Sequence, residues 1–137
     1  NHLSKGLGFS REDRNANIER IGFVANEITK HGVIAICSVI APYREAREKN
    51  RSFISKNGTY VEIHVSTPLR VCIKRDPKCL YAKAKSGLLP HFTGIDDPYE
   101  KPQAAEVVID TTRISPEQAA NKILRYLRSK KVLQSPL

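Results

Sequence analysis

The feature that most constrains this chain is an almost unbroken apolar run, Val33-Ile34-Ala35-Ile36-Cys37-Ser38-Val39-Ile40. A strand with one wet face alternates polar and apolar residues, whereas a strand covered on both faces has a continuous apolar sequence rich in β-branched residues. The run therefore predicts a strand buried within a parallel sheet. Parallel sheets occur almost only in α/β proteins, because their crossover helices cover both faces.

The rest of the chain alternates between helical and extended patterns, which predicts an α/β fold with a parallel sheet. Only three strands are apparent, although sheets average roughly five or six. We therefore expect an N-terminal part of the sheet to be missing from this sequence. The expected elements are helices at about 11–31, after Pro42, after Thr67-Pro68, at 79–85 and from Ser115, with strands at 33–40, 60–65 and 107–109 and a loop at 87–106.

Several helix boundaries carry their own chemical signals. Ser10 with an acidic residue three positions later resembles a capping box, and Gly32 supplies a stop. Pro42 suits a first helical turn, and Thr67-Pro68 combines an N-cap with a proline at the first helical position. Ser115-Pro116-Glu117-Gln118 is a complete capping box. We expect one domain over residues 1–128 and a tail over 129–137.

Composition narrows the function. The 137 residues carry a formal charge of +9, which favours anionic partners. No apolar run approaches the length of a membrane span, so we expect no membrane association. The three cysteines form no CxxC pair and the four histidines have no metal-site spacing, so we expect reduced thiols, a cytoplasmic location and no metal site among these residues.

Two segments have the chemistry of an anion site. Arg14 and Asn17 are i, i+3 neighbours on one helix face, and a guanidinium with an amide can clamp a phosphate or sulfate. An exposed polar face is the alternative. Ile40–Arg44 leads from a strand end into a helix, a position that suits anions but also occurs as plain strand-to-helix geometry.

A third segment has the composition of a lid. Lys74–Lys85 is strongly basic and is followed by the loop Phe92–Glu100. A mobile basic lid over a phosphate-rich ligand excludes water on closure. A solvated basic helix is the alternative. No GxxxxGK[ST] phosphate loop occurs anywhere in the chain.

In their order and spacing, these segments resemble the adenylylsulfate (APS) kinase family. The resemblance covers about residues 3–127 and is specific, since few other families carry all the motifs at these distances. It implies a three-layer P-loop kinase fold whose first strand and P-loop are absent from this chain. The segments are Leu7–Ile21 (LGFSREDRNANIERI), Ile40–Arg44 (IAPYR), Arg75–Tyr81 (RDPKCLY) and Phe92–Glu100 (FTGIDDPYE).

The resemblance also implies an activity and a set of site residues. The family transfers the γ-phosphoryl group of ATP to the 3′-hydroxyl of APS with Mg²⁺, giving PAPS and ADP in sulfate assimilation. The implied ATP contacts are Arg75 and Ile114. No catalytic residue can be named, the Mg²⁺ ligands are expected in the missing part, and the chain alone is expected to be inactive. The implied APS contacts are Phe9 and Phe92, which sandwich the adenine, with Arg14, Asn17, Ile40, Ala41, Lys78 and His91.

The sequence departs from the family at two other positions. Ala41 stands where many relatives have serine, which excludes a phosphoserine there, and Cys79 replaces the glycine usual after Lys78. The resemblance implies APS and ATP as partners, a homodimer, and possible fusion to ATP sulfurylase. A non-catalytic sensor of APS or PAPS within ATP sulfurylase is the alternative function. A nucleic-acid binder rests on charge alone and is disfavoured, because aromatic content is 7% and no such module is present.

Overall fold

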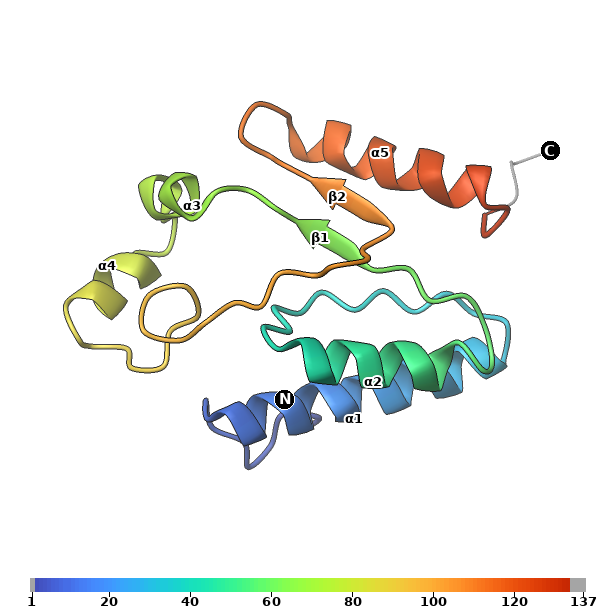
Figure 1. Cartoon of the computed structure of the whole chain (residues 1–137), viewed down its shortest axis with the longest axis horizontal. Coiled ribbons are helices and arrows are strands. Elements are labelled where there is room, and N and C mark those ends of the chain that lie inside the picture. Colours follow the sequence, from blue (N-terminus) through green and yellow to red (C-terminus); the bar gives the residue numbers. More distant parts are fainter. Residues whose placement is uncertain (1, 134–137) are drawn as a thin grey trace. The chain divides into compact units, whose positions relative to one another are not determined.

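The computed structural model describes residues 2–133, which contain helices and a small parallel sheet (Figure 1). The predicted alternation of helix and strand is confirmed, with fewer strands than expected. The elements are α1 Arg11–Lys30, α2 Arg44–Ile54, β1 Ile63–Val65, α3 Leu69–Arg75, α4 Leu80–Lys85, β2 Val107–Ile109 and α5 Pro116–Ser129.

The chain folds as two compact units. The first unit combines Asn1–Tyr60 with Ala84–Lys101, and the second combines Val61–Lys83 with Pro102–Leu137. Each unit is therefore built from two separate stretches of sequence, and each is described by itself below.

In the first unit, α1 and α2 lie side by side (Figure 1). The helices approach closely at Gly22, because a Cβ there would lie 2.2 Å from the Asn50 side chain. Asn50 Nδ2 donates a hydrogen bond to the Ile18 carbonyl oxygen at 2.8 Å. Ile18 packs with Ala46 and Ala41 in a small buried core. This core fixes α1 against the turn that leads into α2.

The second unit is organised around the two-stranded parallel sheet. β1 pairs with β2 in the register Ile63–Val107 to Val65–Ile109. Ile109 is only 1% exposed and is the best buried aliphatic residue of this unit. α5 packs on β2, where Lys122 Nζ donates to the Val108 carbonyl oxygen at 2.7 Å. The capping box predicted at Ser115 is present, and α5 ends at Ser129. Residues 134–137 of the predicted tail lie outside the described residues.

The prediction of a buried strand at 33–40 was wrong. The structure has no strand there, and Ile36 is 91% exposed. A strand needs a hydrogen-bonded neighbour, and the described residues provide none for this segment. The segment runs extended between α1 and α2, with Val33 and Ile34 more than half exposed. Local sequence identified its preference for a sheet but not whether a partner strand lies beside it.

Other boundaries were predicted well, with small shifts. Ser10 caps α1 by accepting from the Asp13 backbone N–H, and β2 has the predicted bounds. Pro68, not Thr67, is the N-cap of α3. The Thr67 hydroxyl instead contacts the Thr111 hydroxyl at 2.7 Å, so it joins the loops that follow the two strands.

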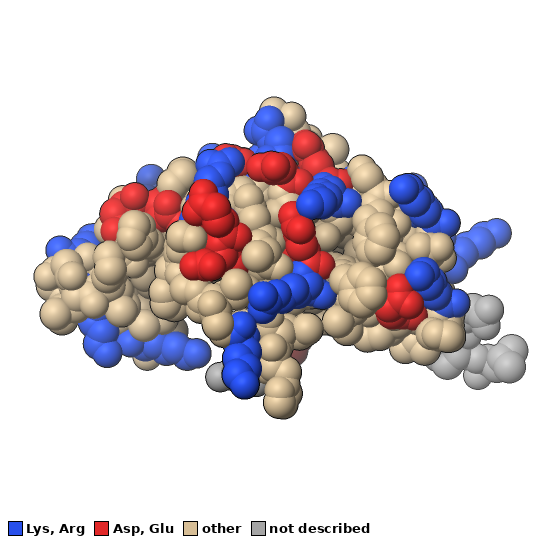
Figure 2. All heavy atoms as spheres, turned by 90° about the horizontal axis from the view of Figure 1, so that it is seen from below, with Lys and Arg blue, Asp and Glu red and all other residues tan. Residues whose placement is uncertain are grey.

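No helix within the described residues is long and apolar enough to cross a membrane. On the face shown in Figure 2, acidic side chains lie among the basic ones. On that face, the excess of positive charge therefore forms no continuous basic patch.

Candidate functional site

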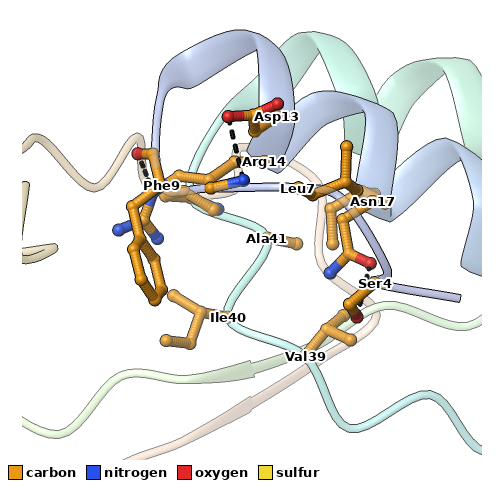
Figure 3. Close-up of a pocket in the computed structure, with 12 residues that line it drawn as sticks. Ser4, Leu7, Phe9, Asp13, Arg14, Asn17, Val39, Ile40 and Ala41 are labelled. Atoms are coloured by element: carbon orange, nitrogen blue, oxygen red, sulfur yellow. Dashed lines mark hydrogen bonds between the residues drawn. The ribbon is translucent and has the colours of Figure 1, made fainter. Parts of the chain in front are cut away.

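A pocket of about 350 Å³ lies in the first unit, where the start of α1 meets the segment that precedes α2 (Figure 3). Its walls are a mixture of apolar side chains and hydrogen-bonding groups. Two apolar side chains are largely open to solvent, since Phe9 is 71% and Ile40 63% exposed. The lining residues are Ser4, Leu7, Gly8, Phe9, Asp13, Arg14, Asn17, Ile18, Val39, Ile40, Ala41 and Pro42.

One wall of the pocket is a strained turn held in place by a buried arginine. Ala41 has a φ of 42°, a left-handed value that L-residues adopt at a cost. Arg47, only 7% exposed, donates from Nη1 to the Ala41 carbonyl oxygen at 2.7 Å. Its Nη2 donates to the Glu100 carbonyl oxygen at 2.6 Å. One guanidinium therefore fixes both the turn and the loop beside it.

Arg14 joins the start of α1 to the loop at 91–97. Its Nε donates to the Phe9 carbonyl oxygen at 3.0 Å, and the guanidinium lies 5.7 Å from the centre of the Phe9 ring. Nη1 donates to Thr93 Oγ1 at 3.2 Å, and Nη2 donates to the His91 carbonyl oxygen at 2.5 Å. A guanidinium has five N–H groups, so these bonds leave one on each terminal nitrogen for a ligand.

Asp97 is the counter-charge of Arg14. Its Oδ2 lies 3.6 Å from Arg14 Nε and accepts a hydrogen bond from the Tyr43 hydroxyl at 2.8 Å. Burial, reinforced by the adjacent Asp97 carboxylate, raises the pKa of Tyr43. Tyr43 therefore stays protonated through neutral pH and keeps donating to Asp97. This network connects the loop to the residue that precedes α2.

Asp96 stabilises the same loop through hydrogen bonds to the loop's own backbone. Its two carboxylate oxygens accept from the backbone N–H groups of His91 at 2.7 Å and Phe92 at 2.6 Å. Desolvation acts to raise the pKa of Asp96, but these backbone hydrogen bonds together outweigh it and lower the pKa. His91 has a φ of 57°, so the backbone turns sharply just before Phe92.

The predicted anion position at the N-terminus of α2 is taken by the protein's own carboxylate. Glu100 Oε2 accepts from the Arg44 backbone N–H at 2.6 Å, and Glu100 Oε1 lies 3.5 Å from Arg11 Nη2. Tyr43, the N-cap residue, provides no side-chain cap. Glu100 therefore supplies the cap from 56 residues away.

In the second unit, Arg75 is bound to the loop after β2. Its guanidinium donates to the Thr111 hydroxyl at 2.9 Å and to the Thr111 carbonyl oxygen at 2.6 Å. A longer bond of 3.4 Å reaches the Thr112 carbonyl oxygen. Ile114 follows in the same loop, so the two residues predicted to contact ATP belong to one region of this unit. Lys78 also belongs to this unit.

The structure groups the residues predicted for APS as follows. Phe9, Arg14, Asn17, Ile40 and Ala41 all line the pocket. His91 and Phe92 belong to the same unit, in the loop that Arg14 binds, but do not line the pocket, and Lys78 belongs to the other unit.

Sequence reasoning missed the residues that hold this pocket in shape. Arg47 binds Glu100 across 53 residues and Thr93 binds Arg14 across 79, separations that local patterns do not reveal. Ser4 and Asp96 act over shorter separations, of 13 residues to Asn17 and five to His91. The only available signal was the acidic pair inside the FTGIDDPYE motif, because carboxylates in a basic chain need partners. The missed residues are Ser4, Tyr43, Arg47, Thr93, Asp96, Asp97 and Glu100.

Among residues 2–133, no group of three or more His, Cys, Asp or Glu side chains is placed to hold a metal ion. The three cysteines are unpaired thiols.

Comparison with known proteins places these observations in a family. The family model for adenylylsulphate kinase matches residues 1–110. An adenylyl-sulfate kinase of Synechococcus sp. (strain JA-2-3B'a(2-13)) is 51% identical over 129 residues, which are 94% of this chain and 72% of that protein. A sulfate adenylyltransferase of Aspergillus oryzae is 45% identical over 93% of this chain and 22% of its own length.

A solved structure agrees with the sequence comparison. The APS kinase of Mycobacterium tuberculosis, in complex with AMPPNP and APS, superposes with a TM-score of 0.87 at 35% identity. The match covers 92% of this chain and 73% of that one. The chain thus has the α/β fold of these P-loop kinases, and it belongs to the adenylylsulphate kinase family.

Proposed function

We propose that this chain forms the APS-binding part of an adenylyl-sulfate kinase, which transfers the γ-phosphoryl group of ATP to the 3′-hydroxyl of APS. The observation that carries the proposal is the pocket of the first unit. There the start of α1 and the turn before α2 bring Phe9, Arg14, Asn17, Ile40 and Ala41 together. Relatives about half identical to this chain bear the name of this activity.

The pocket offers a separate surface to each part of APS. The exposed rings and methyl groups of Phe9 and Ile40 suit the adenine, since stacking of a base on an aromatic side chain contributes ~1–3 kcal/mol. The remaining N–H groups of Arg14 and the amide of Asn17 suit the anionic phosphosulfate. A planar base and an anion on one small molecule explain why apolar and donor groups line one pocket.

The loop at 91–97 has a supporting role in this proposal. Arg14 binds the carbonyl groups of Phe9 and His91, and so fixes the backbone beside both predicted adenine contacts, Phe9 and Phe92. Phosphoryl transfer relies on positioning and charge stabilisation rather than on covalent chemistry by the protein. The contribution of this unit is therefore to hold the acceptor still.

The ATP side of the reaction is proposed for the second unit. Arg75, held by the loop after β2, and Ile114 in the same loop are our candidates for contact with ATP. Mg²⁺ supplies positive charge to the phosphates in such transfers. We assign neither a Mg²⁺ ligand nor a catalytic base to the described residues.

The comparisons favour a catalytic kinase over a sensor of APS or PAPS. The relatives at 51% identity are named adenylyl-sulfate kinases, and this chain covers more than two thirds of their length. Sensor domains tend to lose the motifs, whereas Phe9, Arg14 and Asn17 are retained here and line one pocket.

Calorimetric titration with APS and with ATP tests the proposal. Arg14→Ala and Asn17→Ala should weaken APS binding far more than ATP binding. Each removes a hydrogen bond to a charged group, so the loss in APS affinity should be about tenfold or more. Lys49→Ala is the control, since Lys49 pairs with Glu19 outside this pocket and should leave APS binding unchanged. Unchanged APS affinity in both pocket variants would contradict the site assignment.

A further inference from the structure

The Asn17 amide is hydrogen-bonded to Ser4, a residue that is not among the APS contacts implied by the family resemblance. Ser4 Oγ donates a hydrogen bond to Asn17 Oδ1 at 3.0 Å, and both residues line the pocket. Figure 3 shows the amide oxygen facing Ser4 while the amide nitrogen points toward the middle of the pocket. A carboxamide has its acceptor and its donors on opposite branches, so engaging the oxygen presents the donors to a ligand.

The backbone that carries Ser4 is itself fastened to α1. Arg20 Nη1 donates to the carbonyl oxygens of Leu3 at 3.0 Å and Lys5 at 3.2 Å, the residues on either side of Ser4. The Leu7 backbone N–H donates to the Ser4 carbonyl oxygen at 3.2 Å and closes the turn. Arg20 lies three residues after Asn17, so both side chains leave the same face of one helix.

We propose that Ser4 and Arg20 are positioning residues that fix the Asn17 amide with its donor toward the substrate anion. The proposal rests on the proposed function, in which Asn17 binds APS. Arg20 fixes the backbone of the turn by hydrogen bonds, the turn positions the Ser4 hydroxyl, and the hydroxyl donates to the Asn17 amide oxygen. The amide torsion has two nearly equivalent orientations, so without Ser4 the amide also presents its oxygen to the anion, which repels it.

The local charges agree with this direction. Asp13 is the carboxylate that lines the same pocket, and its Oδ2 already accepts from the Gly8 backbone N–H at 3.0 Å. If the Asn17 amide oxygen faced the pocket, it would add a second acceptor beside the Asp13 carboxylate. If the amide nitrogen faces the pocket, its N–H groups join those of Arg14 as donors to an anion. The Ser4 hydroxyl therefore determines whether the Asn17 amide attracts an anion together with the Arg14 guanidinium or repels it.

Nuclear magnetic resonance of the free protein tests the orientation without any ligand. The side-chain amide signals of Asn17 are assigned by their loss in Asn17→Ala. Ser4→Ala and Arg20→Ala should each shift these signals, whereas Ser4→Thr, which keeps the hydroxyl, should leave them close to the parent positions. Signals that do not move in Ser4→Ala would overturn the proposal whether or not the protein binds APS.

Calorimetry then tests the consequence for binding. Ser4→Ala should weaken APS binding about threefold to tenfold, the range of one hydrogen bond, and leave ATP binding unchanged. Ser4→Thr should restore APS affinity. In an Asn17→Ala background, Ser4→Ala should add less than about twofold, because its effect passes through the amide. An equal loss in both backgrounds would overturn the positioning role, since Ser4 would then contact APS itself.

Absence of APS binding in the parent protein would overturn the proposed function, while the resonance experiment still decides the Ser4–Asn17 link.

Discussion

At the scale of single residues, three of the four described non-glycine residues with a positive φ lie in segments near the proposed ligands, and the fourth, Lys131, follows α5. Ala41 lines the pocket and His91 precedes Phe92, and both have positive φ without being glycine. Cys79, beside Lys78, has a φ of 53°. Such conformations cost about 1–2 kcal/mol each and persist where the surrounding contacts impose them. The left-handed φ also gives a physical reason for the glycine that the family usually has in place of Cys79.

Substitutions at Cys79 should reveal this strain. Cys79→Val should lower the free energy of unfolding by about 1–2 kcal/mol, because a β-branched residue is poorly tolerated at positive φ. Cys79→Gly should unfold no earlier than the parent, since relief of strain offsets the greater entropy of the unfolded chain. Denaturant unfolding under reducing conditions measures both. A valine variant as stable as the glycine variant would contradict the left-handed assignment.

Asp96 should make the loop at 91–97 sensitive to acid. Its pKa is lowered from 3.8 in the folded chain, so the stabilisation is complete above that value and is lost as the pH falls through the folded pKa. Hydrogen exchange at the His91 and Phe92 amides should therefore accelerate, beyond the intrinsic change, below about pH 3.8. Asp96→Asn should exchange faster at neutral pH and show no such additional acceleration. The same acid response in both proteins would exclude Asp96 as its source.

At the scale of elements, the sequence predicts a helix or strand well when the residues that define its ends lie close to those ends in the chain. The start of α1, the end of α1 and the start of α5 were predicted because Ser10, Gly32 and Ser115 act within a few residues of the ends they define. The buried strand at 33–40 was wrong because pairing needs a neighbour that local sequence does not specify. Of the twelve residues that line the pocket, five were predicted as site residues. The contacts that shape it, such as Arg14 with Thr93, join distant segments and left no periodic signal.

The contact between α1 and α2 leads to a prediction about Gly22. A Cβ at this position would meet the Asn50 side chain at 2.2–2.4 Å, so Gly22→Ala must displace Asn50 or separate the helices. Overpacking of this kind costs typically about 1–3 kcal/mol, which exceeds the gain in helix propensity. Thermal unfolding should show the loss. Ala16→Gly on the same helix is a comparison in which helix propensity changes without overpacking. A more stable Gly22→Ala protein would show that the helices lie further apart.

At the scale of the whole molecule, apolar surface is distributed unevenly. Ile109 is 1% exposed, whereas Ile36 is 91% exposed. Ile109→Ala should cost about 2–4 kcal/mol in the free energy of unfolding, because it leaves a cavity beside the sheet. Ile36→Lys should change it by less than about 0.5 kcal/mol. Chemical denaturation of the two variants measures this contrast. A large loss for Ile36→Lys would show that the 33–40 segment is covered in solution.

The Glu100 cap on α2 has a consequence for the order in which the protein is made. Glu100 reaches Arg44 from 56 residues further along the chain, and the first unit is interrupted by Val61–Lys83. When Tyr60 has left the ribosome, α2 is still uncapped and Arg14 has none of its loop partners. Synthesis adds roughly 5–20 residues per second. For some seconds, therefore, the nascent helices lack the loop contacts that hold the pocket in its final shape. The residues that line the pocket are therefore made early, but the loop contacts of Arg14 and Arg47 that hold them become available only after residues 91–100 are made.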